Sequence, residues 1–302
     1  MTQASSERES GSTTIDGSVR VEVEGADTEL DVRPLRTSEE LDVCVRLQRK
    51  IWGMEYGDIV PASLLKVSQN VGGVAVGAFV NGDEAVGFVY GITGVRDGRL
   101  THWSHMLGVL EAYRGRRIGT SLKLLQRDWL MERGVMEMRW TFDPLVSGNA
   151  HFNLNILGVR IHSYVPEMYN DTGSGLHSFG TDRFIAHWDL SRHPSDPAPR
   201  VDREVAWDEA PILASDASGH GMSGLRSGDG LPQAIRIEIP PHIMAVNATA
   251  PARAMAWRRA TRRAFLDAWR EGYRVVGFAR SPCGQRCHYQ LLRSHDVSVR
   301  PG

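Results

Sequence analysis

The stretch from residue 109 to residue 120 has the residue types needed to bind a phosphate. It reads Val-Leu-Glu-Ala-Tyr-Arg-Gly-Arg-Arg-Ile-Gly-Thr, which predicts the end of an apolar strand, a turn and the start of a helix. Such a turn directs backbone N–H groups and the guanidinium groups of Arg114, Arg116 and Arg117 toward one point, where an anion can bind. The alternative is three arginines on a solvated helix start, but cations there oppose the helix dipole unless an anion joins them. The sequence therefore predicts a phosphorylated ligand at this turn.

Side chains that could exchange protons lie near the turn. His102 and His105 belong to a predicted strand at 100–109, and histidine is the side chain whose ordinary pKa suits proton removal near neutrality. Three residues apart on a strand, they should face opposite sides of the sheet. Each could equally be a histidine that is only hydrogen-bonded inside the sheet. Asp143, which precedes Pro144, could orient a histidine or hold an amine, or it could cap the following turn.

Composition and charge limit the class of protein. The chain has 302 residues, of which 41% are hydrophobic and 24% charged, which is enough for one large domain or two modest ones. Its 35 Lys and Arg residues nearly balance 36 Asp and Glu residues, so no net field favours nucleic acid. Three cysteines, Cys44, Cys283 and Cys287, are too few for a disulfide framework and indicate a reducing compartment. Cys283 and Cys287 could form a metal pair, but two incidental thiols are favoured, so we expect no metal site.

The sequence indicates a cytoplasmic protein. No apolar stretch is long enough to span a bilayer, and the N-terminus lacks a basic and then apolar signal segment. Residues 1–25 are polar and rich in Ser, Thr, Glu and Gly, which predicts a disordered leader.

The elements that position the turn follow from periodicity and turn signals. Asn81-Gly82-Asp83 predicts a hairpin, and Ser38 is expected to cap a helix that ends near Gly53. The helix after the turn has apolar residues at helical spacing and ends near Gly134. The strand that follows should pair in parallel with the 100–109 strand, because a helix connects the two. Up to residue 190 we expect strands at 30–35, 74–80, 85–90, 100–109, 136–142, 159–164 and 183–190, and a further helix at 149–157.

The C-terminal third has a different composition. Residues 191–230 are rich in Pro, Asp, Ser and Gly, which predicts a linker. Beyond it we expect strands at 234–239, 273–278 and 288–292 and a helix at 251–270. That helix carries six arginines, which could bind RNA or an anionic surface, although a solvated face is the commoner use of such a stripe.

The motif Val-x-x-x-Tyr-Arg-Gly-x-x-Ile-Gly-Thr after a strand resembles the acyl-CoA-binding motif of the GNAT N-acetyltransferase superfamily. The resemblance covers about residues 30–190 and includes the order of the predicted elements. Ser-His-Met-Leu at 104–107, Trp-Thr-Phe-Asp-Pro-Leu at 140–145 and Asn-Ala-His-Phe-Asn at 149–153 resemble a bacterial branch of predicted acetyltransferases. The C-terminal extension of that branch resembles residues 234–292.

The resemblance implies acetyl-CoA as cofactor and assigns roles to residues around the turn. The diphosphate would bind the backbone N–H groups that begin the helix, and a backbone N–H between Leu107 and Val109 would polarise the thioester carbonyl. Asn149 would contact pantetheine or phosphate oxygens, or else cap a helix. The implied cofactor-binding residues are Leu107, Val109, Arg114, Gly115, Arg116, Arg117, Ile118, Gly119, Thr120 and Asn149.

Two departures from the superfamily pattern matter. The superfamily usually has Gly where this chain has Arg117, which adds charge but gives up the freedom of a residue without Cβ. The turn can still form if the φ of Arg117 is negative. The tyrosine that serves many members as the acid is absent, since Leu154 occupies the comparable position. Tyr164 and Tyr169 lie downstream and could replace it, although aromatic core filling is the commoner role.

Together these observations predict a mixed α/β fold with a mostly antiparallel sheet, a splayed parallel strand pair and helices on both faces. We expect a leader at 1–25, a GNAT domain at 26–192, a linker at 193–230 and an αβ extension at 231–302. The expected activity is direct transfer of an acetyl group from acetyl-CoA to a small-molecule amine, because no cysteine lies near the site. His105 is the expected base, with Asp143 and Tyr164 as further catalytic candidates. The alternatives are a non-catalytic acyl-CoA-binding module and, less favoured, an RNA-associated transferase. A homo-oligomer is compatible with the sequence.

Overall fold

The computed structural model describes residues 12–13, 19–22, 29–54, 56–82, 84–169, 178–196, 205–213, 230–281 and 283–293. The chain forms two compact units, Met1–Met138 and Arg139–Gly302. This boundary falls inside the predicted 26–192 domain, and the predicted domain limits remain predictions. Residues 1–11 and most of 193–230 lie outside the described part of the chain. Within the predicted disordered leader at 1–25, residues 12–13 and 19–22 instead form strands, because they pair with each other and with the strand at 29–34.

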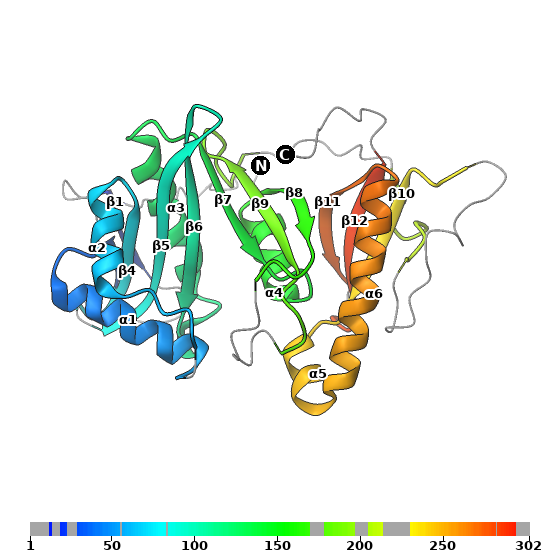
Figure 1. The fold of residues 1–302 in the computed structure, drawn as a ribbon, viewed down its shortest axis with the longest axis horizontal. Helices are drawn as coiled ribbons and strands as arrows, with labels where there is room; N and C mark the ends of the chain where they lie inside the picture. The colour runs from blue at the N-terminus through cyan, green and yellow to red at the C-terminus, as the bar shows by residue number, and fades with distance from the viewer. Residues whose placement is uncertain are drawn as a thin grey trace, which may run out of the picture. The chain divides into compact units, whose positions relative to one another are not determined.

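The first unit is built on an antiparallel sheet (Figure 1). Its strands lie side by side in chain order, each antiparallel to its neighbour. The predicted hairpin joins β4 and β5, and its turn residues Asn81 and Gly82 have φ values of 52° and 86°, as a tight hairpin turn requires. The strands are β1 (Ser12–Thr13), β2 (Val19–Glu22), β3 (Glu29–Pro34), β4 (Val74–Val80), β5 (Glu84–Arg96) and β6 (Arg99–Val109).

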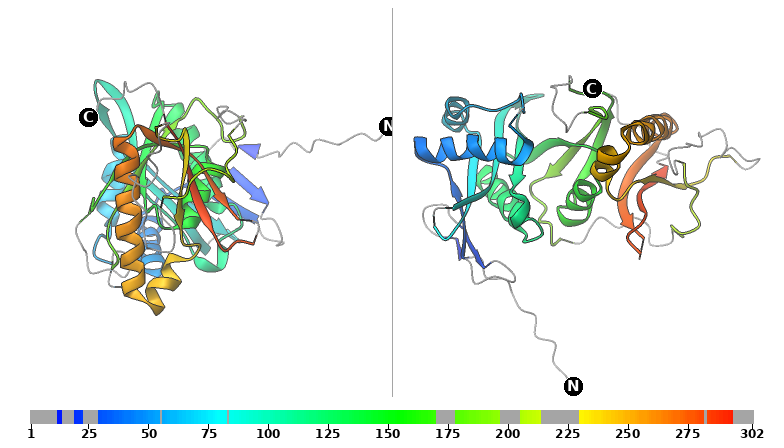
Figure 2. Two further views of the ribbon diagram at one scale, coloured as in Figure 1. Left: turned by 90° about the vertical axis from the view of Figure 1, so that its right-hand side faces the viewer. Right: turned by 90° about the horizontal axis from the view of Figure 1, so that it is seen from below.

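Helices cover both faces of this sheet (Figure 2). Helices α1 (Ser38–Trp52) and α2 (Ala62–Asn70) lie on one face, and α3 (Ile118–Met131) lies on the other. α1 begins with a capping box between Thr37 and Glu40, so the capping residue is one position before the predicted Ser38. The sequence analysis missed α2. Its buried side chain Leu65 joins a core with Leu41, Phe88 and other apolar side chains of α1, β4 and β5.

The second unit contains two sheets and a long helix. In one sheet β7 (Glu137–Phe142) lies beside β9 (Arg183–Asp189), and β9 pairs with β8 (Arg160–Val165). In the other, β12 (Cys287–Arg293) pairs with both β10 (Ala234–Ile239) and β11 (Tyr273–Arg280). Its helical elements are α4 (Ser147–Ala150), the π-helical turn η2 (His151–Ile156), α5 (Ile243–Thr249) and α6 (Pro251–Arg270).

Aromatic side chains form the core of the second unit. The ring of Phe184 on β9 contacts the rings of Phe265 on α6 and Tyr289 on β12, with centroids 4.9 and 5.3 Å apart. Large rings of this kind contribute both buried area and edge-to-face contacts. This core joins both sheets of the unit to α6, so residues 234–293 pack as an integral part of it.

Most elements agree with the sequence analysis. The predicted helix at 149–157 is instead a short α-helix followed by a π-helical turn. The fold class is mixed α/β, with mostly antiparallel strands, one parallel pair and helices packed on the sheets, as the sequence predicted. Within the described residues, no helix combines the length and apolarity that crossing a membrane would require.

Candidate active site

The glycine and arginine turn lies at the surface, between β6 and α3. Gly115 has a φ of 80°, and no side chain caps the first turn of α3. The N–H groups that begin a helix have no partners within it, so this start presents open donors at the positive end of the helix dipole. Gly119 and Thr120 are partly exposed there. An anion such as a diphosphate fits this arrangement.

Arg117 takes a backbone conformation that the sequence analysis did not expect. Its φ is 59° and its ψ is 3°, which is the left-handed region. The turn therefore forms with a positive φ at Arg117 and not with the negative φ that the sequence analysis considered. A residue with a Cβ pays about 1 kcal/mol or more for this conformation, whereas glycine does not. The turn keeps the geometry that favours glycine and places a cationic side chain on it.

The other two arginines of the turn are held without a carboxylate partner among the described residues. The Nε group of Arg114 donates to the carbonyl oxygen of Val109 at 3.2 Å. The guanidinium carbon of Arg116 lies 5.3 Å from the centre of the Tyr113 ring. Both contacts fix the direction of a side chain without neutralising its charge, which leaves positive charge beside the open helix start.

His105 occupies a β-bulge. Tyr90 and Gly91 are consecutive on β5 and pair with Met106 and Ser104, so His105 is the extra residue of β6. Bulges redirect side chains and are over-represented beside active sites. His105 is exposed, and its ring lies edge-on to the Tyr90 ring, with 6.1 Å between the ring centroids. Partial burial lowers the pKa of His105, and the carboxylate of Asp58 opposes that shift. At neutral pH the imidazole is therefore uncharged and can accept a proton.

His102 lies on the opposite face, in a buried hydrogen-bonded chain. Its Nδ1 is 2.9 Å from Thr93 Oγ1, which donates its own hydrogen to the carbonyl of Gly72. Nδ1 must therefore donate, and Nε2 accepts from Gln126 Nε2 at 3.0 Å. Burial, with the charge of Lys123 added, lowers the pKa of His102 to about 3. His102 is a neutral structural histidine, which leaves His105 as the base candidate of the pair.

The hydrogen-bonded network that contains His102 and Gln126 extends to the buried side chain of Lys123. Lys123 on α3 donates to Ser104 Oγ at 2.7 Å, and Ser104 donates to Gln126 Oε1 at 2.9 Å. Burial holds the pKa of Lys123 well below its ordinary value. These contacts join β6 to α3 and fix the position of the helix on the strand.

An aromatic wall and a carboxylate adjoin β6 on the α1 face. A Cβ at Gly108 would lie 2.8 Å from Ile51 and 3.4 Å from the Trp52 ring, so the end of α1 passes directly over β6. The Trp52 ring contacts the Tyr56 ring at 5.3 Å between centroids. Asp58, in the loop after α1, is exposed. The sequence analysis missed these residues, because only the folded chain brings the end of α1 onto β6.

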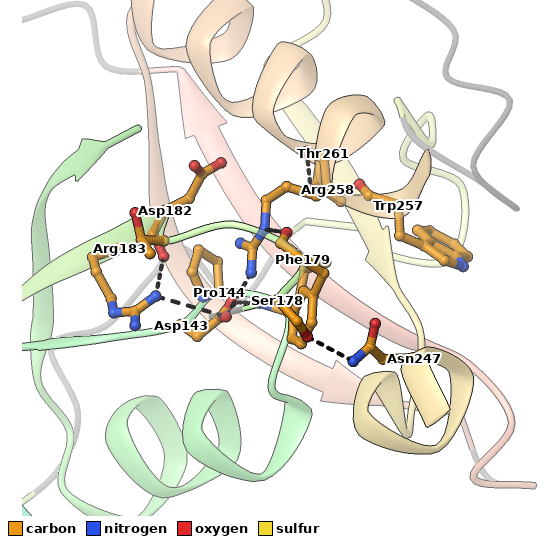
Figure 3. Close-up of polar contacts among 12 residues, drawn as sticks. Asp143, Pro144, Ser178, Phe179, Asp182, Arg183, Asn247, Trp257, Arg258 and Thr261 are labelled. Atoms are coloured by element: carbon orange, nitrogen blue, oxygen red, sulfur yellow. Dashed lines mark hydrogen bonds and ion pairs between the residues drawn. The ribbon is translucent and has the colours of Figure 1, made fainter. Parts of the chain in front are cut away.

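Asp143 is held by an ion pair in the second unit (Figure 3). Its Oδ2 accepts from Arg258 Nη2 at 2.5 Å, and its Oδ1 accepts from the backbone N–H of Leu145 at 2.8 Å. Arg258 is 1% exposed and also donates through Nε to the carbonyl of Phe179. Arg183 Nη1 lies 3.7 Å from the same carboxylate oxygen. The turn-capping contact of Asp143 is the one that the sequence offered as an alternative to catalysis.

Tyr164 is also hydrogen-bonded to a carboxylate of the second unit. It is buried, and its hydroxyl donates to Asp182 Oδ2 in a short contact. Arg262 binds both oxygens of Asp182, at 2.9 and 2.6 Å. Burial, with the nearby charge of Asp182, raises the pKa of Tyr164. The phenol holds its proton firmly, which opposes a role as an acid.

The remaining candidates occupy separate places. Asn149 is exposed on α4, and its carbonyl oxygen accepts from Asn153. The Tyr169 hydroxyl lies 3.1 Å from Thr141 Oγ1. Leu107 and Val109 are half-buried on β6 and pair with Val89 and Gly87 of β5. β6, the turn and α3 are continuous in the first unit, whereas Asp143, Asn149 and Tyr164 belong to the second.

One cysteine lies in the first unit, and the described residues include His, Cys, Asp and Glu side chains as potential metal ligands. Cys44, the cysteine of the first unit, is 1% exposed, and burial raises its pKa to about 12. No group of three or more His, Cys, Asp or Glu side chains within the described ranges could hold a metal ion.

No model of a known protein family matches the sequence, and no curated protein matches it. Solved structures similar to the chain include a GNAT-family acetyltransferase from Streptococcus pneumoniae, at 14% identity and a TM-score of 0.43 over 53% of this chain and 98% of that one. The ribosomal-protein-S18-alanine N-acetyltransferase from Escherichia coli has 15% identity and a TM-score of 0.42, over 56% of this chain and 98% of its own. A structure of the NatC complex bound to Gag peptide and CoA has 14% sequence identity and a TM-score of 0.43, over 53% of this chain and 98% of its own.

Proposed function

We propose that the protein is an N-acetyltransferase of the GNAT type, which moves an acetyl group from acetyl-CoA to an amine. The observation that carries the proposal is the open start of α3. It follows a bulged strand with a neutral histidine, and its turn has positive φ at Gly115 and Arg117. Acetyl-CoA, when bound, supplies an acetyl thioester that is already activated for attack by an amine.

The chain's own residues would divide the remaining tasks. The N–H groups from Ile118 to Thr120 bind the diphosphate, aided by the positive charge of the turn. A backbone N–H between Leu107 and Val109 polarises the acyl oxygen. His105 takes a proton from the acceptor amine, directly or through a water. The leaving thiol has an ordinary pKa near 8.5, so catalysis does not require a dedicated acid.

The acceptor would approach from the α1 face. Asp58 offers a carboxylate, and the Trp52 and Tyr56 rings offer π faces, which together attract an ammonium group. That ammonium must lose a proton before it can attack, and the nearby His105 can accept it. The class of acceptor that fits is a primary or secondary amine with an apolar body. We expect direct transfer, because the cysteine of this unit is buried.

The test is release of free thiol from acetyl-CoA in the presence of a panel of amines. His105→Ala should lower kcat by about 100-fold or more, as expected for loss of a general base. His187→Ala is the matched control, since His187 lies on β9 in the other unit, and it should leave kcat unchanged. If acetyl-CoA raises the melting temperature but no amine releases thiol, the alternative of a non-catalytic acyl-CoA-binding module is correct. Equal kcat in the wild type and His105→Ala would assign the base elsewhere.

A further inference from the structure

A pocket lies in the first unit, away from the glycine and arginine turn. It has a volume of about 210 Å³ and is formed where β3 ends and β4 begins. Trp129, one of its walls, lies near the far end of α3, about 17 Å along the helix from Ile118. The pocket is therefore separate from the start of α3, where the cofactor is proposed to bind.

The lining combines an apolar floor with positive charge at the rim. Pro34, Val74 and Val76 are buried and supply the floor, and Trp129 is half-buried at the side. Arg36 and Lys66 are exposed and supply the rim. No Asp or Glu is among the described residues that line the pocket. Lys66 makes no hydrogen bond or ion pair within the described chain, so its charge is available to a ligand.

The walls of the pocket are held in place before any ligand binds. Gln69 Nε2 donates to the carbonyl of Leu35 at 2.7 Å and lies 3.3 Å from that of Ala75, which ties α2 to both strands. The guanidinium carbon of Arg133 lies 3.9 Å from the centre of the Trp129 ring, and Arg133 Nη1 donates to the Trp129 carbonyl at 2.8 Å. A preformed pocket does not lose affinity to the ordering of its own side chains.

The volume and charge define a class of ligand. A dry cavity of about 150 Å³ accommodates benzene, so this pocket has room for a six-membered ring with a short chain. The charge of Lys66 favours a negative group at the mouth of the pocket, and the apolar floor favours an apolar body. We propose that the pocket binds a small monocarboxylate with an aromatic or branched apolar body, with its carboxylate at Lys66 and its body against Trp129.

Calorimetric titration of the full chain with 3-phenylpropionate tests the proposal. The neutral amide of the same acid and inorganic phosphate serve as comparison ligands. The acid should bind, and both comparison ligands should bind more weakly, the amide by up to about fivefold, which is the effect of one partly exposed charge contact. Lys66→Met should weaken binding of the acid by a similar factor, whereas Lys50→Met, at another exposed helical lysine, should leave it unchanged. Lys66 and Lys50 are both surface residues, so neither variant endangers the fold.

NMR signals of the lysine side chains can show where the acid binds. The chain has only Lys50, Lys66 and Lys123, and Lys123 is buried, so ¹³C-methylation gives few lysine signals to follow. The signal assigned to Lys66 with a Lys66→Arg variant should shift on addition of the acid, and that of Lys50 should not. No heat at millimolar acid, equal binding of acid and amide, unchanged binding in Lys66→Met, or equal shifts at both lysines would each overturn the proposal.

Discussion

Arginines in the two units are used in opposite ways. In the second unit, Arg258 and Arg262 are paired with Asp143 and Asp182, and each carboxylate accepts further hydrogen bonds. At the turn before α3, Arg114 and Arg116 contact a carbonyl oxygen and an aromatic ring, and the helix start has no cap. One region neutralises its charges internally. The other leaves positive charge and open N–H groups at the surface.

This difference shows that the hydrogen-bond and ion-pair partners of a side chain limit its possible role more than its residue type does. Asp143 and Tyr164 have side chains suited to catalysis, yet both are engaged in bonds that stabilise the fold. His105 lies on a β-bulge and is exposed, whereas both ring nitrogens of the neighbouring His102 are hydrogen-bonded. A group that is already satisfied contributes to stability, and a group left open contributes to binding or chemistry.

The largest expected effect comes from breaking the buried pair. Arg258→Ala should lower the free energy of unfolding by about 3–5 kcal/mol, because Asp143 would be left buried without its main partner. Denaturant unfolding measures this change. Arg259→Ala, at the exposed neighbour, should stay within about 0.5 kcal/mol of the wild type. Equal, small losses in both variants would mean that Asp143 is solvated and not dependent on Arg258.

A smaller effect is expected at Tyr164. Tyr164→Phe removes the hydroxyl that donates to Asp182 and should cost about 1–3 kcal/mol of stability. Because the phenol is buried and its pKa is raised, kcat should not change. Thiol-release kinetics at saturating substrates check the second part. A fall in kcat without a loss of stability would restore Tyr164 as the acid.

At the turn, stability and affinity should move in opposite directions. Arg117→Gly relieves the left-handed conformation and should raise the free energy of unfolding by up to about 1 kcal/mol. It also removes a cation, so binding of coenzyme A should weaken by about threefold to tenfold. Arg117→Ala is the matched control, since it removes the charge but keeps the strain. A gain in affinity on substitution by glycine would argue against a contact between Arg117 and the phosphates.

The smallest effect concerns pH. The Asp58 carboxylate opposes the lowering of the His105 pKa, so Asp58→Asn should lower that pKa further. A base works only when unprotonated, and the acid limb of kcat/KM should therefore move to lower pH, by a few tenths of a unit. Asp97→Asn, in the β5–β6 turn, should leave the profile unchanged. A shift to higher pH in Asp58→Asn would contradict the role of this charge.

The sequence predicted the elements that have strong local signals. The Asn81-Gly82 turn, the apolar spacing of α3 and the glycine after it correctly placed β4, β5, β6 and α3. The sequence analysis missed two helices. α2 begins after Pro61, which provides no side-chain cap, and α5 is a short helix before α6. Neither has a local pattern strong enough to identify it, and packing against neighbours stabilises both.

The phosphate site at the turn stays a prediction, and it could be made from the sequence because the turn residues lie in one continuous stretch. The φ of Arg117 could not be read from its residue type, because only the surrounding fold forces a non-glycine residue into that region. The contacts of Asp143 and Tyr164 join residues far apart in the chain, and Asp58 approaches His105 only after α1 packs on β6. Long-range contacts of this kind have no signature in a single sequence.

Calorimetric titration with coenzyme A tests most directly the claim that the start of α3 binds a diphosphate. Coenzyme A should bind the wild-type chain, and pantetheine, which lacks the phosphates, should bind far more weakly. Gly119→Trp should abolish binding of coenzyme A without unfolding the protein, whereas Gly94→Trp, at an exposed position of β5 with open space around it, should bind normally. Unchanged affinity in Gly119→Trp, or equal affinity for coenzyme A and pantetheine, would contradict the account.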